Sequence, residues 1–283
     1  MERTVYVNGH FLPESEATIS VFDRGFLMAD AVYEVTTVID GKLIDFDGHM
    51  ERLRRSLGEL GMREPDEMDE LITLHREILG LNNLNNGRIY LQVTRGIADR
   101  DFSYDPEMKP SVVLFSQEAP CINAPQRHKG IKVATLDDIR WKRRDIKTTQ
   151  LLAPSLAKME AKKRGADDAW MVEDGYVTEG TSNNAFIVKD GKLITRPLST
   201  DILHGITRAA VLRYAAEAGI ELEERAFTVE EALEADEAFI TSASAICWPV
   251  TEIDGQRVGG GQPGPVARRV GDLYLEEAMK RAR

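Results

Sequence analysis

The sequence predicts an α+β protein of two domains with much antiparallel sheet. Three observations support this prediction: Asx-Gly pairs recur between strand-like runs, segments with helical spacing separate those runs, and a stretch with two prolines and no periodicity lies near the middle of the chain. The 283 residues, 42% of them hydrophobic, are enough for one large domain or two ordinary domains with real cores.

The Asx-Gly pairs predict hairpins. A type I′ turn needs positive φ at both central residues, and Asn, Asp and Gly adopt that conformation most readily. Strand-like runs precede the pairs, for example 34–39 and 184–188. The five pairs are Asn8-Gly9, Asp40-Gly41, Asp174-Gly175, Asp190-Gly191 and Asp254-Gly255. A chain built from such hairpins is expected to form antiparallel sheet.

Five segments are predicted to be helical. In the first, Asp47 is the expected N-cap, apolar residues share one face as far as Leu60, and Gly61 is the stop signal. A second helix is expected from about Asp66 to Leu79. The remaining three are predicted at 150–164 before Gly165, at 206–218 before Gly219, and from Pro265 to about Met279.

The first half of the chain is predicted to close with two strands, 87–95 and 111–117. The stretch 118–125 follows, with two prolines in eight residues. We interpret it as a linker and predict an N-terminal α+β domain at 1–118, a linker at 119–125 and a C-terminal domain at 126–283. A cleft between two domains is a common place for a small-ligand site.

Composition excludes several classes of function. The net charge of −11 argues against nucleic acid as the main partner. The two cysteines do not form a disulfide framework, and the first residues lack the apolar core of a signal peptide. No apolar run approaches the roughly 20 residues that span a bilayer. No His pair or CxxC has metal-ligand spacing. We therefore expect a cytoplasmic protein without a metal or a membrane partner.

Lys147 is the first candidate for chemistry. It follows a predicted strand at 132–136 and a basic segment that contains Lys142, Arg143 and Arg144, and it precedes a predicted helix. One interpretation is a solvated basic loop, which is the commoner role of lysine. The other is a lysine that points into a cleft, where loss of solvent would leave its amine neutral and nucleophilic.

Glu179 is the second candidate. It lies in the segment 177–186, which joins two predicted strands and is rich in hydroxyl and amide side chains. The segment can be an ordinary polar loop. Alternatively, a carboxylate there could face a pyridine nitrogen and keep it protonated, so that the ring accepts electrons from a substrate carbanion.

Several segments could bind phosphate. The helix start at Gly205-Ile206-Thr207 offers backbone N–H groups and a hydroxyl. The small-residue turn at 241–245 offers a second set. Arg52, with Arg54 and Arg55 beside it, could pair with a phosphate or simply form a solvated helix face. Residues 259–261 are three glycines without a following GK[ST], so they predict a flexible loop.

Taken in order, these segments resemble the fold-type IV, or class IV, aminotransferases. The resemblance covers nearly the whole chain, and the ordered set is more specific than any single piece. It rests on Tyr6-Val7-Asn8-Gly9, Phe22-Asp23-Arg24-Gly25-Phe26, 47–53, Asp145-Ile146-Lys147, 178–183 and 205–208. The resemblance implies a small N-terminal α/β sandwich-like domain and a larger C-terminal domain with a β-barrel-like core that binds pyridoxal 5′-phosphate.

The resemblance also implies roles for individual residues. Lys147 matches the lysine that carries the cofactor covalently and moves a proton between substrate Cα and cofactor C4′. Glu179 matches the partner of the pyridine nitrogen. The residues that match phosphate ligands are Arg52, Ile206, Thr207, Ser242 and Ser244. The family further implies a homodimer with its active site near the subunit interface and the cofactor between the two domains.

Within this family, the segment 31–35 looks most like that of D-amino-acid transaminases. Tyr33, Arg100 and Ser182 match substrate-binding positions. The best-known D-specific enzymes have His two residues after the arginine, where this chain has Phe102. Losing one polar or charge-assisted donor costs about 1.5–3 kcal/mol of binding. The resemblance predicts transfer of an amino group from a D-amino acid such as D-alanine to a 2-oxo acid such as 2-oxoglutarate.

Four alternatives stay open from the sequence. Two are transaminases of the same fold, acting on branched-chain L-amino acids or on (R)-amines. A third is an aminodeoxychorismate lyase, which needs no 2-oxo acid acceptor. The fourth is a protein that binds the cofactor without catalysis, which the presence of both Lys147 and Glu179 disfavours.

Overall fold

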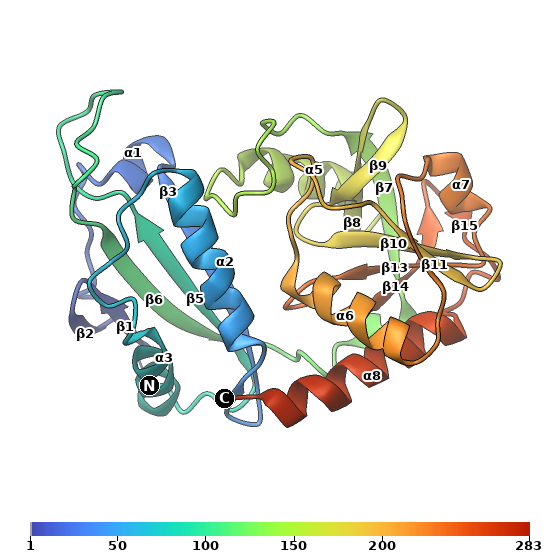
Figure 1. Cartoon of the computed structure of the whole chain (residues 1–283), viewed down its shortest axis with the longest axis horizontal. Coiled ribbons are helices and arrows are strands. Elements are labelled where there is room, and N and C mark those ends of the chain that lie inside the picture. Colours follow the sequence, from blue (N-terminus) through green and yellow to red (C-terminus); the bar gives the residue numbers. More distant parts are fainter. Residues whose placement is uncertain (1) are drawn as a thin grey trace. The chain divides into compact units, whose positions relative to one another are not determined.

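The computed structural model describes residues 2–283, which form two compact units (Figure 1). The first unit contains the chain up to Cys121 together with the short segments 146–150 and 281–283. The second contains 122–145 and 151–280. The change from one unit to the other falls within the stretch 119–125, and the predicted C-terminal domain 126–283 contributes two short segments to the first unit.

A six-stranded antiparallel sheet forms the centre of the first unit within the described residues. The order of its strands across the sheet is β2 (His10–Pro13), β1 (Thr4–Val7), β6 (Ser111–Glu118), β5 (Gly87–Thr94), β3 (Ala31–Ile39) and β4 (Lys42–Leu43). The long strands alternate between a buried and a less buried face, which is the period of two that a half-covered sheet requires.

Helices α2 (Phe46–Glu59) and α3 (Leu71–Leu81) pack on this sheet, and the short helix α1 (Arg24–Met28) precedes β3. Buried Leu53, Leu57 and Ile78 belong to α2 and α3 and form part of the core. Burying each such side chain contributes about 1.5–3 kcal/mol. The helices therefore hold the sheet in place mainly through apolar burial.

Two helix starts differ from the prediction. Helix α2 begins at Phe46 after Asp45, which has φ 52° and makes no side-chain cap, so the prediction that Asp47 is the N-cap is wrong. Asp47 lies in the first turn and accepts a hydrogen bond from Arg283. Helix α3 begins at Leu71, because 66–70 form turns instead, with the N–H of Met68 bonded to the carbonyl of Pro65.

The second unit contains a larger mixed sheet. Its main order across the described residues is β12 (Leu222–Glu224), β11 (Lys192–Thr195), β10 (Asn184–Lys189), β13 (Glu237–Thr241), β14 (Trp248–Ile253), β7 (Ile131–Asp137), β8 (Asp168–Glu173) and β9 (Tyr176–Gly180), with β15 (Gln256–Arg257) on β14. Strand β9 at one end also contacts β10, so the sheet curls on itself. The prediction of an α+β fold with a barrel-like core in the C-terminal part is confirmed.

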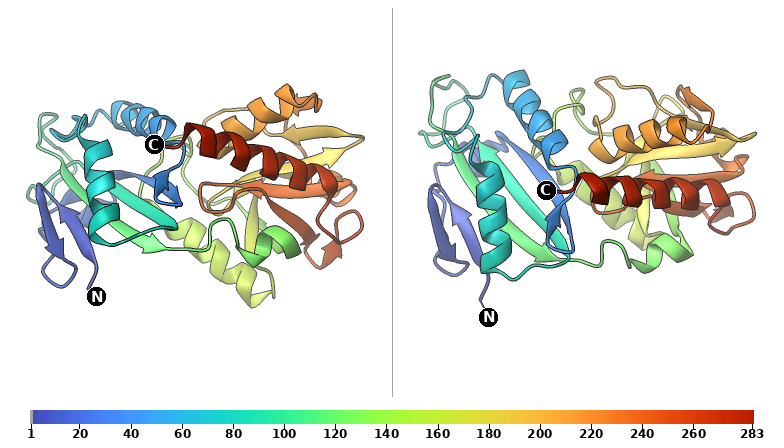
Figure 2. Two further views of the ribbon diagram at one scale, coloured as in Figure 1. Left: turned by 90° about the horizontal axis from the view of Figure 1, so that it is seen from below. Right: turned by 60° about the horizontal axis from the view of Figure 1, so that its bottom comes forward.

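The described helices of this unit are α4 (Pro125–Lys129), α5 (Leu152–Lys163), α6 (Ile206–Glu217), α7 (Val229–Leu233) and α8 (Pro265–Arg281). Three of them, α5, α6 and α8, match the predicted helical segments to within three residues at each end. Figure 2 shows α6 and the long α8 running side by side. Pro125, predicted as the end of an irregular stretch, instead occupies the first turn of α4, where a missing N–H has no cost.

The predicted hairpin turns are confirmed. Both residues of every Asx-Gly pair have positive φ; for example, Asp190 has 52° and Gly191 has 77°. This turn geometry connects β10 to β11 and sets their register, with Lys189 opposite Lys192. In the part of the chain that the structure describes, no helix has the length and apolar character needed to cross a membrane.

Candidate active site

Lys147 belongs to the first unit, where its backbone is fixed on both sides. Its carbonyl accepts a hydrogen bond from Tyr33 N at 3.0 Å. The next residues continue this pairing, with a bridge between Thr148 and Val32 and a bond of 3.1 Å from Thr149 N to the Ala31 carbonyl. The segment 146–150 thus lies along the beginning of β3. This anchoring holds Lys147 at a constant position on the sheet.

The side chain of Lys147 lies over an aromatic ring. Its Nζ is 4.1 Å from the centroid of the Tyr33 ring. Tyr33 stacks on Tyr90, and Tyr90 stacks on Phe115, with ring centroids 5.4 and 4.8 Å apart. A cation over a ring face is attracted by about 0.5–1 kcal/mol at exposed sites and by more when desolvated. The structure therefore brings together two of the predicted residues, Lys147 and Tyr33.

Arg52 lies on α2 with only 7% of its surface exposed. Its Nε and Nη2 donate to the two oxygens of Glu34 at 2.8 and 2.7 Å, a two-pronged geometry that fixes the plane of the guanidinium group. His49, one turn earlier on α2, contacts the same carboxylate through Nδ1 at 2.7 Å. Glu34 projects from β3 and is completely buried.

The electrostatics of this cluster favour an ionised Glu34. Burial alone would raise the pKa of the carboxyl group, but the charge and hydrogen bonds of Arg52, together with His49, outweigh that effect and lower the pKa of Glu34 to about 2. The neighbouring arginines differ: Arg54 has a side chain that is 43% exposed and pairs with Asp69 at the surface. The structure thus separates Arg52 from the solvated arginines beside it.

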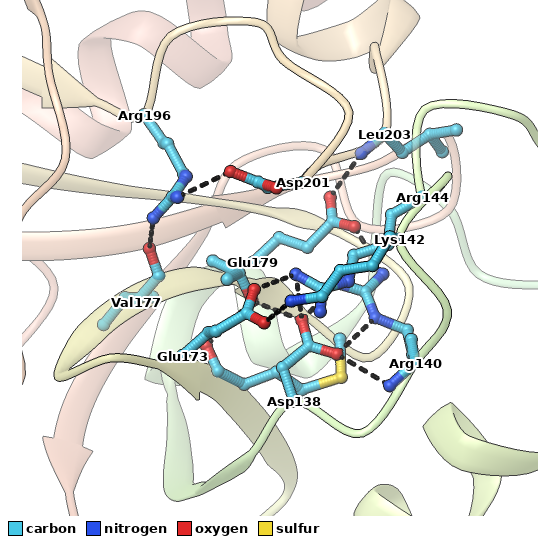
Figure 3. Close-up of polar contacts among 12 residues, drawn as sticks. Asp138, Arg140, Lys142, Arg144, Glu173, Val177, Glu179, Arg196, Asp201 and Leu203 are labelled. Atoms are coloured by element: carbon cyan, nitrogen blue, oxygen red, sulfur yellow. Dashed lines mark hydrogen bonds and ion pairs between the residues drawn. The ribbon is translucent and has the colours of Figure 1, made fainter.

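Glu179 lies at the end of β9 in the second unit and is buried. One carboxylate oxygen accepts a hydrogen bond from Arg140 Nη1 at 2.5 Å, and the other accepts from Asn184 Nδ2 at 2.9 Å and from Leu203 N at 3.1 Å. Figure 3 shows this carboxylate between Arg140 and Leu203. Burial raises the pKa of Glu179, and the positive charge of Arg140 opposes that rise without cancelling it.

Arg140 is itself held in place. Its Nε and Nη2 donate to the two oxygens of Asp138 at 2.9 and 2.7 Å. Asp138 also accepts a hydrogen bond from Thr178 at 2.7 Å, and Arg144 lies 3.4 Å from it (Figure 3). Arg140 therefore donates to Glu179 from Nη1, while Asp138 holds the opposite edge of the same guanidinium group.

Asn184 connects Glu179 with the start of α6. Besides its bond to Glu179, its Nδ2 donates to the carbonyl of Leu203 at 3.0 Å. A Cβ at Gly205 would lie 2.1 Å from Asn184 Oδ1, so any larger residue there would displace the Asn184 amide. Gly205 is the N-cap of α6, and Ile206 and Thr207 are its first two residues. Their N–H groups lack intrahelical partners, which makes this end suitable for an anion.

The turn after β13 lies beside the same asparagine. Thr241, the last residue of β13, pairs in register with Asn184. Ser242 Oγ and Ser244 Oγ follow, 3.3 Å apart, and the N–H of Ala245 donates to Ser242 Oγ. Among the side chains that the structure describes, Thr241 Oγ1 is a buried hydroxyl without a hydrogen-bond partner. The second unit thus gathers Glu179, the α6 start and the serine turn around Asn184.

Two further predicted residues have exposed side chains. Arg100 lies in the segment after β5, with its guanidinium 5.8 Å from the ring centroid of Phe102, and Phe102 is 82% exposed. Ser182 is exposed in the turn between β9 and β10. The described contacts do not bring either residue to Lys147 or Glu179.

The sequence did not single out Glu34, His49, Asp138, Arg140 or Asn184 as members of these clusters. Glu34 had a signal: a lone glutamate on the buried face of a strand, where a carboxylate needs a partner. The other partners became apparent only through contacts between residues far apart in the sequence. Arg140 and Glu179, for example, are 39 residues apart.

The chain is similar to known proteins over most of its length. The family model "Amino-transferase class IV" matches residues 31–253. The chain is 41% identical over 269 residues to the D-alanine aminotransferase of Staphylococcus haemolyticus and 40% identical over 268 residues to that of Bacillus licheniformis. Each alignment covers 94% of both chains.

Solved structures show the same fold. The branched-chain aminotransferase of the archaeon Thermoproteus uzoniensis with norvaline superposes with a TM-score of 0.87 at 29% identity, covering 99% of this chain and 96% of that one. The branched-chain amino acid aminotransferase of Escherichia coli gives 0.88 at 26% identity, covering 98% and 95%. The predicted resemblance and the two-domain fold are therefore confirmed.

Proposed function

Because the chain belongs to the class IV aminotransferases, we propose that it transfers an amino group from a D-amino acid, such as D-alanine, to a 2-oxo acid, such as 2-oxoglutarate. One observation carries the D-specific part of the proposal. Identity to D-alanine aminotransferases is about 40% over nearly the whole length, whereas the branched-chain enzymes with the same fold share 25–29%.

Class IV aminotransferases use pyridoxal 5′-phosphate, and the residues of this chain fit that cofactor. The second unit offers a buried carboxylate for a protonated ring nitrogen and, at Thr241, a buried hydroxyl without a partner beside the serine turn. When bound, the cofactor supplies a ring that accepts the electron pair left at substrate Cα after deprotonation.

Lys147 is the proposed catalytic residue. Its amine would carry the cofactor covalently and then hold the proton removed from substrate Cα before delivering it to cofactor C4′. Two backbone hydrogen bonds, from Tyr33 N to the Lys147 carbonyl and from Thr149 N to the Ala31 carbonyl, fix the backbone around Lys147. The Lys147 side chain can therefore change its rotamer while its Cα stays in place. Glu179 would keep the ring nitrogen protonated, and its pKa, raised by burial, would fall once a cation lies beside it.

The proposed phosphate ligands are Arg52, the helix start at Ile206 and Thr207, and the serine turn. The helix contributes backbone N–H groups and the positive end of its dipole. Ser242 and Ser244 contribute hydroxyls from a turn in which the two oxygens lie 3.3 Å apart. Arg52 contributes the one full positive charge in this set, which a phosphate dianion needs.

Tyr33, Arg100 and Ser182 are the proposed substrate-binding residues. Tyr33 lies directly beneath Lys147 Nζ, where a substrate that reacts with this amine must arrive. Arg100 would pair with the substrate carboxylate. Phe102 cannot donate a hydrogen bond, so we propose that the carboxylate depends more heavily on Arg100 and Tyr33 than it would with histidine at residue 102.

We further propose a homodimer that works in the cytoplasm. Exposed apolar side chains gather on the first unit where two segments lie side by side, because Ala98 N donates to Phe22 O and Ile97 pairs with Asp23. The exposed residues of this patch are Val21, Phe22, Phe26, Ile97 and Phe102. A patch of this kind is typical of a protein–protein contact. Cys121 and Cys247 are buried and unpaired, which suits a reducing compartment.

A panel of amino acids tests the substrate. The purified holoenzyme is given D- and L-amino acids one at a time, with 2-oxoglutarate as the acceptor, and formation of glutamate is measured. The proposal predicts turnover of D-alanine and dependence on the acceptor. Turnover of L-leucine but not of D-alanine would indicate a branched-chain substrate in place of a D-amino acid. Consumption of the amino donor is measured in parallel, and its consumption without any acceptor would indicate a lyase.

A further inference from the structure

The cluster formed by Glu34, His49 and Arg52 carries one inference beyond the function proposed above. All three side chains are buried, although arginine and glutamate are almost never fully buried unless they are paired. The cluster joins the middle of β3 to the first half of α2. A buried group of this kind has either a structural role or a functional one.

A structural role alone explains the cluster poorly. Removing two charges from water costs several kcal/mol per ion, and apolar residues of similar volume often stabilise a core equally well. The surrounding core of this unit is apolar, with Leu53 and Leu57 fully buried on the same helix. The ion pair therefore needs a reason beyond packing.

The geometry of the ion pair supplies that reason. Glu34 contacts Nε and Nη2, the two nitrogens on one edge of the guanidinium group. A guanidinium group has five N–H donors in a rigid plane, so fixing one edge fixes the direction of the other. His49 holds the second oxygen of Glu34 and prevents the carboxylate from rotating away.

The charge state of the cluster supports the same role. The low pKa of Glu34 keeps it an anion at every physiological pH, so its hold on Arg52 does not depend on pH in that range. A second histidine near this cluster, His75, is fully buried and donates to the Leu71 carbonyl from Nδ1 at 2.7 Å. Burial lowers the pKa of His75 to about 4, so it adds no positive charge to the cluster.

We propose that Glu34 is a positioning residue, secured by His49, that orients the guanidinium group of Arg52 toward the cofactor phosphate. This inference rests on the proposed role of Arg52 as a phosphate ligand. It assigns to Glu34 no contact with the substrate or with the reacting atoms. The consequence is selective: Glu34 supports binding of the phosphate group and not of the pyridine ring.

The test compares binding of two ligands that differ only in the phosphate. Apoenzyme is titrated with pyridoxal 5′-phosphate and with pyridoxal, and both dissociation constants are measured from absorbance. Glu34→Gln keeps the shape of the side chain but places an amide N–H against an arginine N–H. Loss of a residue that orients a ligand-binding side chain typically costs about 10–100-fold in affinity. We expect at least about tenfold weaker binding of the phosphorylated cofactor and unchanged binding of pyridoxal.

Glu237→Gln is the matched control. Glu237 is also a buried glutamate, 8% exposed, and accepts hydrogen bonds from Val266 N and Ala267 N at the start of α8. Its replacement is expected to leave the ratio of the two dissociation constants unchanged. Equal weakening of both ligands in Glu34→Gln would assign the cluster a general structural role and overturn the proposal, as would no weakening at all.

Two more variants keep the proposal testable if Glu34→Gln folds poorly. His49→Ala removes a contact to Glu34 without altering the arginine, and it is expected to shift the same ratio in the same direction by a smaller factor. A variant of Arg52 itself distinguishes its proposed role as a phosphate ligand from the proposed positioning role of Glu34. Arg52→Gln removes the charge as well as the fork of donors. If Arg52→Gln leaves the ratio unchanged, then Arg52 is not a phosphate ligand. If it changes the ratio but Glu34→Gln and His49→Ala do not, only the positioning role is wrong.

Discussion

The two units of this protein each contain a buried carboxylate paired with arginine, but the roles within the pairs are reversed. In the first unit, Glu34 holds Arg52, and the arginine is the proposed ligand. In the second unit, Arg140 holds Glu179, and the carboxylate is the proposed ligand. The same ion pair can therefore present either a fixed cation or a fixed anion.

The pKa values reflect this reversal. The pKa of Glu34 falls to about 2, because Arg52 and His49 together outweigh its burial. The pKa of Glu179 rises, because Arg140 is shared with Asp138 and cannot fully offset burial. The carboxylate that only supports another residue, Glu34, thus stays charged throughout the physiological pH range. A carboxylate that must meet a ligand is left short of positive charge, and a protonated ring nitrogen would supply it.

The largest expected effect comes from Arg140, which serves two buried carboxylates at once. Arg140→Met would leave Asp138 and Glu179 without their main cation, and removing one partner of a buried ion pair costs about 3–5 kcal/mol. We expect that loss in the free energy of unfolding measured in denaturant. Lys142→Met is the control: Lys142 pairs with Glu173 at the surface with 76% of its side chain exposed, and we expect a cost below about 1 kcal/mol. Equal costs for the two variants would show that the buried ion pairs of Arg140 contribute no more to stability than a surface pair.

A smaller effect is expected from acid titration of Glu34. Because its folded pKa is about 2 and its ordinary value is 4.5, the stability that it contributes is present above the ordinary value and disappears as the pH falls toward 2. The shift corresponds to about 3 kcal/mol. The difference in free energy of unfolding between wild type and Glu34→Gln should therefore shrink by about that amount between about pH 5 and pH 2. A difference that stays constant with pH would show that Glu34 has an ordinary pKa in the folded protein.

Local sequence signals predicted a large part of this fold. Asp190-Gly191 predicted its hairpin because positive φ at both residues is a local property of Asx-Gly. The end of α6 before Gly219 followed from a similar local preference. The prediction of an N-cap at Asp47 was wrong because the chain enters α2 two residues earlier, through Asp45 in a left-handed conformation.

The partners of the site residues could not be predicted in the same way. Glu34 meets Arg52 because β3 and α2 pack together, and the two residues are 18 positions apart. The placement of Lys147 in the first unit depends on pairing of 146–150 with β3, although neighbouring residues on both sides belong to the second unit. Such contacts depend on the register between distant segments, which no local pattern encodes. The ordered motifs predicted the candidate residues, and the structure was needed to find the side chains that contact them.

Peptide mapping tests directly whether Lys147 carries the cofactor. The holoenzyme is treated with borohydride, which makes the link between a lysine and the cofactor irreversible, and is then digested and analysed by mass spectrometry. We expect to find the phosphopyridoxyl group on the peptide that contains Lys147 and not in Lys147→Ala. Finding the group on another lysine, such as Lys142, or an equal yield from Lys147→Ala, would show that Lys147 does not carry the cofactor.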